Sequence, residues 1–239
     1  MHHVARPAAI APEHLAILRS SEWFQGLGPT FQRAVLDSAR VVVVRAGTSV
    51  FLRDDENDGI YCVLSGAVRF GAVAPSGKAS AVALIEGPEW FGEIALFDGG
   101  GRTHDAWTEG PSTLLHLPLH HLRRVLADEP DGWRHLGALV VRKLRVALVM
   151  LEDMALEPPR VRLARCLIQL LEGYGRRRGE LPDRVRVSQE RIGTLLSLSR
   201  QTVNELLGEL EQASIVQRQR GGVRILDQAR LRAVAESSS

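Results

Sequence analysis

Hydrophobic residues follow different spacings along the chain, and each spacing predicts a different structure. Residues 12–19 and 29–40 carry apolar positions that share one helical face, which predicts two short amphipathic helices. Residues 41–117 instead contain short apolar runs of the β type, divided by glycine and polar turns. The candidate strands are 41–44, 49–52, 60–64, 67–73, 80–85 and 113–117. Many short strands at such intervals predict a small antiparallel roll or barrel rather than a parallel sheet.

One long helix is predicted from Asp131 to Glu157, because Pro130 stands near its start and Pro158-Pro159 stops it. Its apolar residues lie four, three, four and three positions apart: Val140, Leu144, Ala147, Leu151 and Met154. This is the spacing of a coiled-coil seam, for which an isolated helix has little use. We therefore expect a dimer formed about this helix; packing against its own domain is the alternative.

After the two prolines, the pattern predicts three helices and a hairpin. An amphipathic helix is expected over 161–174, and the arginine-rich stretch 176–179 is expected to be a solvated loop. Two short helices follow, capped by Ser188 and Ser199. Gly193 would permit a close crossing of these helices, which would be locked together by Ile192, Leu196, Val203 and Leu206. A basic hairpin is then predicted from runs 215–218 and 222–226 around Arg220-Gly221.

Composition limits the class of protein. The 239 residues suit two modest domains, and 45% hydrophobic with 24% charged residues is an ordinary globular balance. The longest apolar stretch, near Leu136, is broken by basic residues well short of a membrane span, and residues 1–10 lack the pattern of a secretory signal. Cys62 and Cys166 are too few for a disulfide framework. We therefore expect a protein of the reducing cytoplasm with no membrane partner.

The net charge of +2 conceals an asymmetry between the two ends of the chain. Residues 158–239 hold 15 arginines against 9 acidic residues, whereas the part before them holds 15 basic against 19 acidic residues. A basic C-terminal segment joined to an acidic N-terminal one suggests that the C-terminal part meets a polyanion. A solvated arginine-rich surface is the alternative.

The two short capped helices carry residue types that read duplex DNA. Helices crossing at a tight turn form a helix-turn-helix, whose second helix presents its N-terminal side chains to the major groove. Arginine can bond bidentately to guanine, and glutamine or asparagine to adenine. Side chains at the start of the first helix suit phosphate contacts that fix register. The candidate DNA-binding residues are Ser188, Gln189, Ser199, Arg200, Gln201, Asn204 and Glu205. An ordinary pair of packed core helices is the alternative.

Two motifs, in this order along the chain, resemble the cyclic-AMP receptor protein and fumarate–nitrate regulator family of bacterial transcription factors. The motifs are Trp90-Phe91-Gly92-Glu93-Ile94-Ala95-Leu96-Phe97, closed by Arg102-Thr103, and Leu198-Ser199-Arg200-Gln201-Thr202-Val203. The resemblance covers roughly residues 23–226. It implies an α+β fold with an N-terminal antiparallel β-roll of the cyclic-nucleotide-binding type, a long dimerisation helix and a C-terminal winged helix-turn-helix. The corresponding domains would span 12–129, 130–157 and 158–232.

The first motif, residues 90–97 with Arg102-Thr103, has the residue types of a phosphate-binding cassette. Gly92 and its neighbours can form a short helix whose free N–H groups face an anion. The resemblance implies that Arg102 neutralises a phosphate oxygen, that Thr103 adds a hydroxyl donor, and that Glu93 accepts from a ribose hydroxyl. A simple ion pair between Glu93 and Arg102 across the loop is the alternative. The candidate ligand-binding residues are Gly92, Glu93, Ile94, Arg102, Thr103, Ala147 and Leu148.

The chain departs from the family pattern at positions that bear on the effector and on the operator. In cyclic-AMP-responsive members, hydroxyl residues of the long helix hold the adenine, and the matching positions here are Ala147 and Leu148. An apolar pair cannot make those hydrogen bonds, so cyclic AMP is disfavoured. Another cyclic nucleotide, a cyclic dinucleotide or no nucleotide stay open. Ser197 holds a turn position usually taken by glycine, and Glu205 a position where a basic residue is common, so the operator is expected to differ from the usual site.

Members of the family that sense through an iron–sulfur cluster or haem need particular cysteine or histidine ligands. No cysteine precedes Cys62, which excludes an N-terminal iron–sulfur cluster, and the adjacent His2 and His3 are expected to be bystanders rather than haem ligands. Three histidines close in sequence are expected at the surface rather than on a metal: His116, His120 and His121. We predict neither a metal site nor a catalytic site.

The sequence therefore predicts a homodimeric DNA-binding transcription regulator, gated by a small effector that binds the roll beside the long helix. Its partners would be double-stranded DNA and a second copy of the chain, with RNA polymerase as a further candidate. A hinge near residues 157–159 would reposition the DNA-binding domains, because proline ends a helix and restricts the residue before it. Two alternatives stay open: a ligand-independent regulator with a vestigial nucleotide pocket, and a small β-barrel metalloenzyme, which the lack of any His-x-His motif disfavours.

Overall fold

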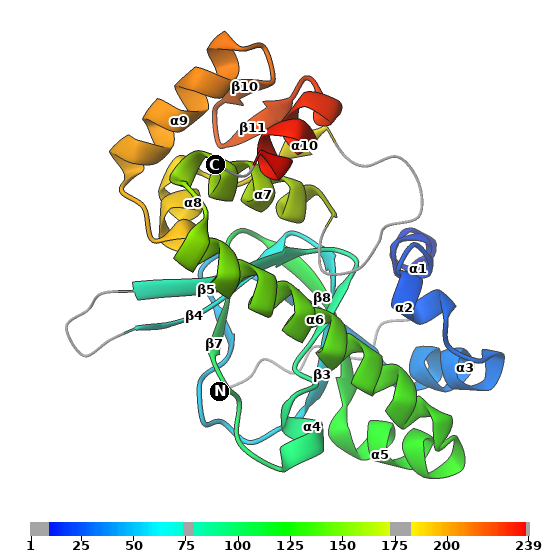
Figure 1. Cartoon of the computed structure of the whole chain (residues 1–239). Helices are drawn as coiled ribbons and strands as arrows, with labels where there is room; N and C mark the ends of the chain where they lie inside the picture. The colour runs from blue at the N-terminus through cyan, green and yellow to red at the C-terminus, as the bar shows by residue number, and fades with distance from the viewer. Residues whose placement is uncertain (1–9, 74–78, 173–182, 238–239) are drawn as a thin grey trace.

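Two antiparallel four-stranded sheets form the first part of the molecule, as a computed structural model describing residues 10–73, 79–172 and 183–237 shows (Figure 1). One sheet has the order β1 (Arg40–Val44), β8 (Ser112–Pro118), β3 (Gly59–Ser65) and β6 (Glu89–Phe91). The other has the order β2 (Ser49–Phe51), β7 (Asp105–Thr108), β4 (Ala67–Val73) and β5 (Ala79–Glu86). A single buried cluster draws on both sheets and includes Phe51, Tyr61, Val68, Phe91 and Leu114. The predicted antiparallel roll is confirmed.

The six predicted strands agree with β1, β2, β3, β4, β5 and β8 to within one residue at each end. The prediction lacks β6 and β7, which are three and four residues long. Neither short strand has an apolar run of its own, because β6 reads Glu-Trp-Phe and β7 reads Asp-Ala-Trp-Thr. Pairing with β3 and β4 defines them instead.

Helices that precede and follow the roll in the chain pack against the sheet that contains β3. They are α1 (Pro12–Arg19), α2 (Glu22–Gln25), α3 (Pro29–Ser38) and α5 (Leu119–Asp128). The rings of Trp23 and Trp90 lie 4.8 Å apart between α2 and β6. The indole N–H of Trp23 also donates to the carbonyl oxygen of His135 at 2.8 Å. The helix predicted over 29–40 ends earlier, at Ser38, because Arg40 begins β1. The short helix α2 was not predicted.

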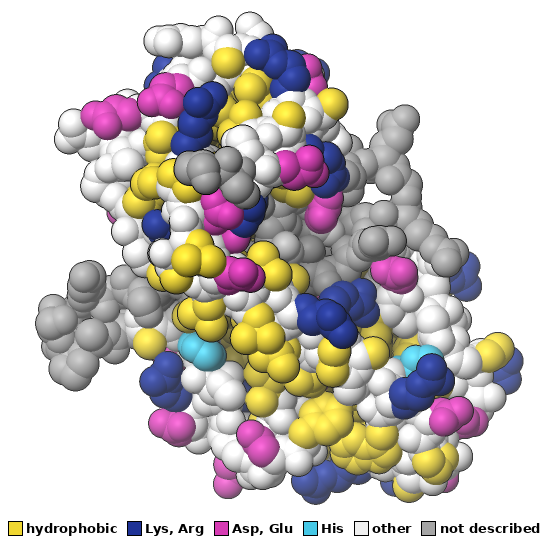
Figure 2. All heavy atoms as spheres, viewed as in Figure 1, with side chains coloured by type: hydrophobic (Ala, Val, Ile, Leu, Met, Phe, Trp, Pro, Cys, Tyr) yellow, Lys and Arg dark blue, Asp and Glu magenta, His cyan; other side chains and the backbone are white. Residues whose placement is uncertain are grey.

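The long helix α6 (Asp131–Leu156) runs from the roll to the C-terminal part of the molecule (Figure 1). Leu136 and Leu139 are buried among the N-terminal helices. From Val141 onward the helix exposes large apolar side chains, namely Val141, Leu144, Leu148, Val149, Leu151, Met154 and Leu156. Figure 2 shows apolar side chains gathered along this helix. The exposed face is wider than the predicted seam, because Val141 and Leu148 also belong to it, whereas Val140 is half-buried.

Four helices and a three-stranded sheet make up the C-terminal part. They are α7 (Pro159–Glu172), β9 (Arg184–Val185), α8 (Gln189–Leu196), α9 (Arg200–Gln212), β10 (Val216–Gln219), β11 (Gly222–Ile225) and α10 (Gln228–Glu236). The core includes Leu163, Leu167, Ile192, Val203, Leu207 and Val223. Leu207 is fully buried, whereas the predicted Leu206 is only partly buried. The end of the predicted helix 161–174 and the loop 176–179 lie outside the described residues, as do His2 and His3.

Two negative findings apply to the described ranges. No helix there is long and apolar enough to cross a membrane. No group of three or more histidine, cysteine, aspartate or glutamate side chains there could hold a metal ion.

Candidate effector site and nucleic-acid interface

Gly92 shapes the turn between β6 and the short helix α4 (Ala95–Asp98). Its φ is +89°, a left-handed conformation that side chains disfavour. A Cβ here would come within 2.7 Å of Nη1 of Arg102, so the guanidinium would have to shift to admit a side chain. The carbonyl oxygen of Gly92 accepts a hydrogen bond of 2.7 Å from that Nη1. The two halves of the predicted cassette are therefore in contact.

Glu93 is buried in the cassette and is paired with a residue of the long helix. Its side chain is 2% exposed, and both carboxylate oxygens accept hydrogen bonds of 2.9 Å from Nζ of Lys143. The same ammonium group donates to the carbonyl oxygen of Trp90 at 2.6 Å. A carboxylate this deeply buried needs such a partner, because an unpaired buried charge costs several kcal/mol. Lys143 is absent from the predicted site; its place one helical turn before Ala147 is the signal that could have found it.

Arg102 is equally buried and has its own partners. Nη2 donates to Oδ1 of Asp58 at 2.5 Å and to the carbonyl oxygen of Gly59 at 2.8 Å. The guanidinium carbon lies 4.3 Å from the ring centre of Phe51, within the range of a cation–π interaction. The proposed alternative of an ion pair between Glu93 and Arg102 is wrong, because each pairs with a different residue of opposite charge.

Asp58 connects Arg102 to an aromatic stack inside the roll. Its Oδ2 accepts a hydrogen bond of 2.5 Å from the hydroxyl of Tyr61, whose ring stacks on His116 with centres 4.3 Å apart. Burial, reinforced by the charge of Asp58, raises the pKa of Tyr61 well above its ordinary value, so this hydroxyl stays a donor. Burial lowers the pKa of His116. No motif in the sequence points to Asp58.

The other predicted ligand residues lie at the surface. Ile94 is 42% exposed and Leu148 is 55% exposed, and Thr103 and Ala147 are exposed as well. The hydroxyl oxygen of Thr103 lies 3.1 Å from Nδ1 of His104. The structure thus brings Gly92, Glu93 and Arg102 together and leaves these four side chains outside that cluster.

The predicted helix-turn-helix is formed by α8 and α9. The hydroxyl oxygens of Ser188 and Ser199 accept from the third backbone N–H that follows each, at 3.3 and 3.0 Å, which confirms both predicted N-caps. A Cβ on Gly193 would lie 2.7 Å from the carbonyl oxygen of Leu198 in the turn, so glycine permits the close approach of the turn to α8. Ser197 has a φ of +54° in the turn, where glycine would adopt the conformation without strain.

The first half of α9 presents polar side chains to solvent: Ser199, Arg200, Gln201, Asn204 and Glu205 are all exposed. Ser188 is exposed and Gln189 is half-buried at the start of α8. Nε2 of Gln201 donates to Oε1 of Glu205 at 2.9 Å. The predicted hairpin is confirmed as β10 and β11, with Gly221 at a φ of +76° in its turn. The short strand β9 adds a third member that was not predicted.

Two arginines of the C-terminal part form ion pairs with residues that precede it in the chain. Arg165 of α7 pairs with Asp153 of α6 and, at 3.1 Å, with Glu157, so it connects both sides of the predicted hinge. Arg191 of α8 pairs with Glu109 of the roll at 3.0 Å. The other carboxylate oxygen of Glu109 accepts from Arg69 at 2.7 Å.

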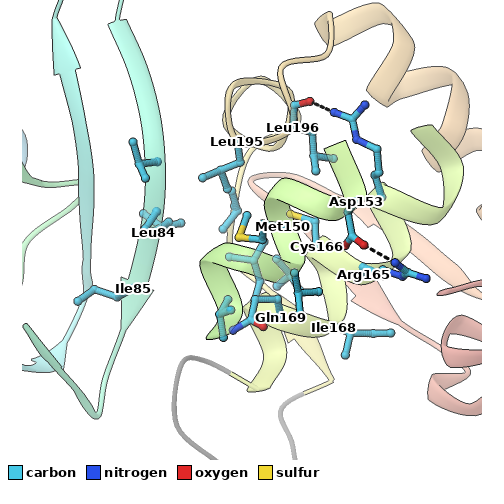
Figure 3. Close-up of a pocket in the computed structure, with 18 of the residues that line it drawn as sticks. Leu84, Ile85, Met150, Asp153, Arg165, Cys166, Ile168, Gln169, Leu195 and Leu196 are labelled. Atoms are coloured by element: carbon cyan, nitrogen blue, oxygen red, sulfur yellow. Dashed lines mark hydrogen bonds and ion pairs between the residues drawn. The ribbon is translucent and has the colours of Figure 1, made fainter. Parts of the chain in front are cut away.

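A pocket of about 330 Å³ lies beside these contacts, between β5, α6, α7 and α8 (Figure 3). Leu84 and Ile85 line it on the β5 side, and Ile168, Leu195 and Leu196 line it on the helical side. Its walls are mostly apolar. The boundary between the roll and the C-terminal part is therefore only partly close-packed.

Comparison with known proteins identifies the domains in which the two candidate sites lie. Residues 41–129 match the cyclic nucleotide-binding domain, and residues 161–234 match the Crp-like helix-turn-helix domain. A CRP-like cAMP-activated global transcriptional regulator of Mycobacterium tuberculosis is 30% identical over 90% of this chain and 96% of its own length. The cyclic AMP receptor protein of Thermus thermophilus is 28% identical over 91% of this chain and 98% of its own.

Solved structures agree on the fold. The structure of FixK2 from Bradyrhizobium japonicum has a TM-score of 0.73 at 20% identity, covering 84% of this chain and 99% of that one. A CRP/FNR-family transcriptional regulator from Thermus thermophilus has a TM-score of 0.65 at 25% identity, covering 84% and 100%. With its cyclic nucleotide-binding domain and its helix-turn-helix DNA-binding domain, the chain belongs to the CRP/FNR family of bacterial transcription regulators.

Proposed function

We propose that a small anionic effector binds the cassette of this regulator and changes the position of α6. The ion pair between Glu93 and Lys143 carries the proposal, because it connects the cassette to the helix about which the dimer would form. A ligand hydroxyl that bonds to Glu93 competes with the ammonium group of Lys143. An effector that prefers the released arrangement therefore shifts the population of α6 positions, and with it the placement of the DNA-binding domains.

The residues of the cassette support a phosphodiester anion as the effector. Arg102 offers a permanently charged guanidinium whose bond to Asp58 can be exchanged for phosphate oxygens, and Thr103 offers a hydroxyl donor. The relative from Mycobacterium tuberculosis is described as cAMP-activated, but Ala147 and Leu148 offer no hydrogen bond to an adenine. We therefore propose a cyclic nucleotide held by phosphate and ribose, with weak selection among bases.

A homodimer about the exposed apolar face of α6 is the second part of the proposal. Leu144, Leu148 and Leu151 are each more than half exposed, which is costly unless a second copy covers them. Parallel pairing of two such helices would direct both copies of α9 to successive major grooves, about 34 Å apart. Residues 157–159 would act as the hinge, held by Arg165.

The exposed side chains of α9 support its placement in the major groove of DNA. Arg200, Gln201, Asn204 and Glu205 would meet base edges. Ser188, Gln189 and Ser199 would meet phosphates. The units would be 12–129, 130–157 and 158–232, although α10 continues to Glu236. The place of action would be the cytoplasm, with RNA polymerase as a further candidate partner.

One observation favours a second candidate, a DNA-binding regulator that acts without a ligand. Both charged groups of the cassette already have internal partners, Glu93 with Lys143 and Arg102 with Asp58. In this alternative the cassette is a structural element, and α6 is held in one position permanently.

Thermal denaturation of the full-length chain against cyclic mono- and dinucleotides separates the two candidates. A ligand present at a hundredfold its Kd should stabilise the native state by about 2.7 kcal/mol. Arg102→Ala should abolish that gain, whereas Arg53→Ala, an exposed arginine nearby in the roll, should retain it. Gel shifts with genomic fragments, with and without the same nucleotides, complete the test. DNA binding that no nucleotide changes, with no thermal gain, would establish the ligand-independent regulator.

A further inference from the structure

Arg218, on strand β10 of the wing, contacts Asn204 of α9, one of the predicted DNA-binding residues. Its Nη1 donates to Oδ1 of Asn204 at 3.0 Å. Its other bonds go to Glu211: the backbone N–H donates to Oε1 at 2.7 Å and Nε donates to Oε2 at 2.6 Å. β10 and α9 run side by side at the top of the molecule (Figure 1).

The spacing of residues on α9 makes this reach possible. Asn204, Gly208 and Glu211 lie four and three positions apart, so they share one face of the helix. A Cβ placed on Gly208 would lie 3.8 Å from Nη1 of Arg218, which shows that the guanidinium crosses the helix directly over the glycine. Glu211 therefore anchors one end of the arginine and Asn204 receives the other. The bonds from Arg218 also lower the pKa of Glu211, which keeps the anchor charged.

The contact determines how the carboxamide of Asn204 is turned. Arginine has donors and no acceptor, so the amide oxygen must face it and the amide nitrogen must face away. Bidentate reading of adenine needs both atoms, one to accept from N6 and one to donate to N7. Because its oxygen is directed toward Arg218, the amide nitrogen of Asn204 is the group that faces away, and it offers its donors to a base edge.

A contact between Gln201 and Glu205, beside Asn204 on α9, has the opposite effect: it leaves an amide oxygen, rather than an amide nitrogen, available to a base. Nε2 of Gln201 donates to the carboxylate of Glu205, so the amide oxygen of Gln201 is left to accept. Gln201 and Glu205 lie four positions apart, and so do Arg200 and Asn204. The first pair forms a row of acceptors, and the second pair forms a row of donors beside it.

We propose that Arg218 is a positioning residue for the reading of DNA sequence, acting through the orientation of Asn204. The donor row, Arg200 and Asn204, fits the acceptor atoms of guanine or thymine. The acceptor row, Gln201 and Glu205, fits the amino groups of cytosine or adenine. The proposal rests on the proposed placement of α9 in the major groove.

Selection of preferred sites from a random duplex library by the full-length chain provides the test. Asn204→Ala identifies the base pair that Asn204 reads, because preference is lost there alone. At that base pair the wild type should prefer guanine or thymine. Arg218→Met should shift the preference toward adenine at least about five-fold, because the freed carboxamide can then bond to adenine through both atoms. Arg218→Lys should retain part of the wild-type preference, since it keeps a donor.

Arg224→Met is the matched control, because it removes a cation from the neighbouring strand β11. Arg224 is 50% exposed and pairs with Asp183 at 2.9 Å, away from α9. Its base preferences should equal those of the wild type. If Arg218→Met does not fold, Glu211→Gln replaces it, since the loss of the anchoring charge should shift the preference in the same direction.

Three outcomes of the site selection would contradict the proposed role of Arg218, each for a different reason. A uniform loss of affinity on all sequences, with a smaller salt dependence and unchanged base preference, would make Arg218 a phosphate contact and overturn the proposal. An unchanged preference in Arg218→Met and Asn204→Ala alike would also overturn it. A wild type that enriches no sequence would refute the placement of α9 itself, and with it the role of Arg218.

Discussion

Lys143 donates to both carboxylate oxygens of Glu93 at 2.9 Å, so a single ammonium group joins the longest helix to the cassette. The two residues are 50 positions apart in the chain, and β6 and α6 bring them together. Glu93 is 2% exposed and Lys143 is 22% exposed, so the pair is largely shielded from water. Because the pair is shielded, removing one partner would leave an uncompensated buried charge and lower the free energy of unfolding.

Lys143→Met should destabilise the protein by about 3 kcal/mol, because it leaves a buried carboxylate without a counter-charge. The double variant Lys143→Met with Glu93→Gln should recover most of the loss, since no net charge is then buried. Urea unfolding measures both values. Arg142→Met is the control: Arg142 lies 3.8 Å from Glu22 in a more exposed pair, and its loss should cost less than about 1 kcal/mol. Equal losses in the two single variants would contradict the special role of Lys143.

The exposed face of α6 predicts the response of the oligomeric state to charge. Leu148→Glu should convert the dimer to a monomer, because a carboxylate in the centre of an apolar interface has no partner and remains hydrated only in the monomer. Sedimentation velocity measures the change. Val43→Glu is the control, since Val43 is 78% exposed on β1 and lies on another element. A dimer that survives Leu148→Glu would place the interface elsewhere.

Two glycines on helices predict opposite effects of the same substitution. Gly193→Ala should destabilise the helix-turn-helix, because its Cβ would lie 2.7 Å from the carbonyl oxygen of Leu198 and the turn between the helices would have to shift. Gly137→Ala should stabilise α6 by up to about 1 kcal/mol, because that Cβ would meet no atom within 4 Å. Thermal unfolding of both variants gives the two signs. A Gly193→Ala variant as stable as the wild type would contradict the need for glycine at that position, and a less stable Gly137→Ala variant would contradict the prediction for α6.

The contact between Arg191 and Glu109 predicts how the DNA-binding domain is held against the roll. Glu109→Gln should increase amide hydrogen exchange in α8, because both Arg191 and Arg69 lose their charged partner. Global stability should fall by only about 1 kcal/mol or less, as is usual for partly exposed ion pairs. Glu190→Gln, on the same helix, is the control. Unchanged exchange in α8 would show that apolar contacts alone hold the domain in place.

The sequence predicts the elements of this fold better than it predicts the partners of the site residues. β3 is recognisable because six of its seven residues are buried apolar or glycine positions in an unbroken run. The caps Ser188 and Ser199 are recognisable because capping is local. β6 has no such local signal, since three residues that include Glu89 become a strand only through pairing with β3.

The same distinction explains the residues that sequence reasoning missed in the site. A lysine on a helix is usually solvated, and only the approach of α6 to β6 makes Lys143 the partner of Glu93. Asp58 lies in an acidic stretch typical of a surface loop, yet it binds the buried Arg102. Leu207 replaces Leu206 in the core because the tertiary packing of α9 selects its buried face more narrowly than the helical repeat does.

His116 predicts a pH dependence of stability. Burial lowers its pKa below the ordinary value of about 6.5, and the positive charges of Arg102 and Arg40 lower it further, although Asp58 opposes them. In the window below the ordinary pKa, the unfolded chain therefore binds a proton that the native protein does not. Because stability rises with pH wherever the unfolded state binds more protons, the native state should lose stability as the pH falls from about 7 toward 5.

His116→Phe isolates this contribution, since phenylalanine keeps a ring stacked on Tyr61 and cannot titrate. Urea unfolding at several pH values should show a smaller loss of stability between pH 7 and pH 5 in the variant than in the wild type. His120→Phe, at an exposed position of α5, should retain the slope of the wild type. Parallel curves for wild type and His116→Phe would mean that other groups carry the acid sensitivity. A steeper curve for His116→Phe would mean that Asp58 outweighs burial at His116 and that the pKa of this histidine is raised rather than lowered.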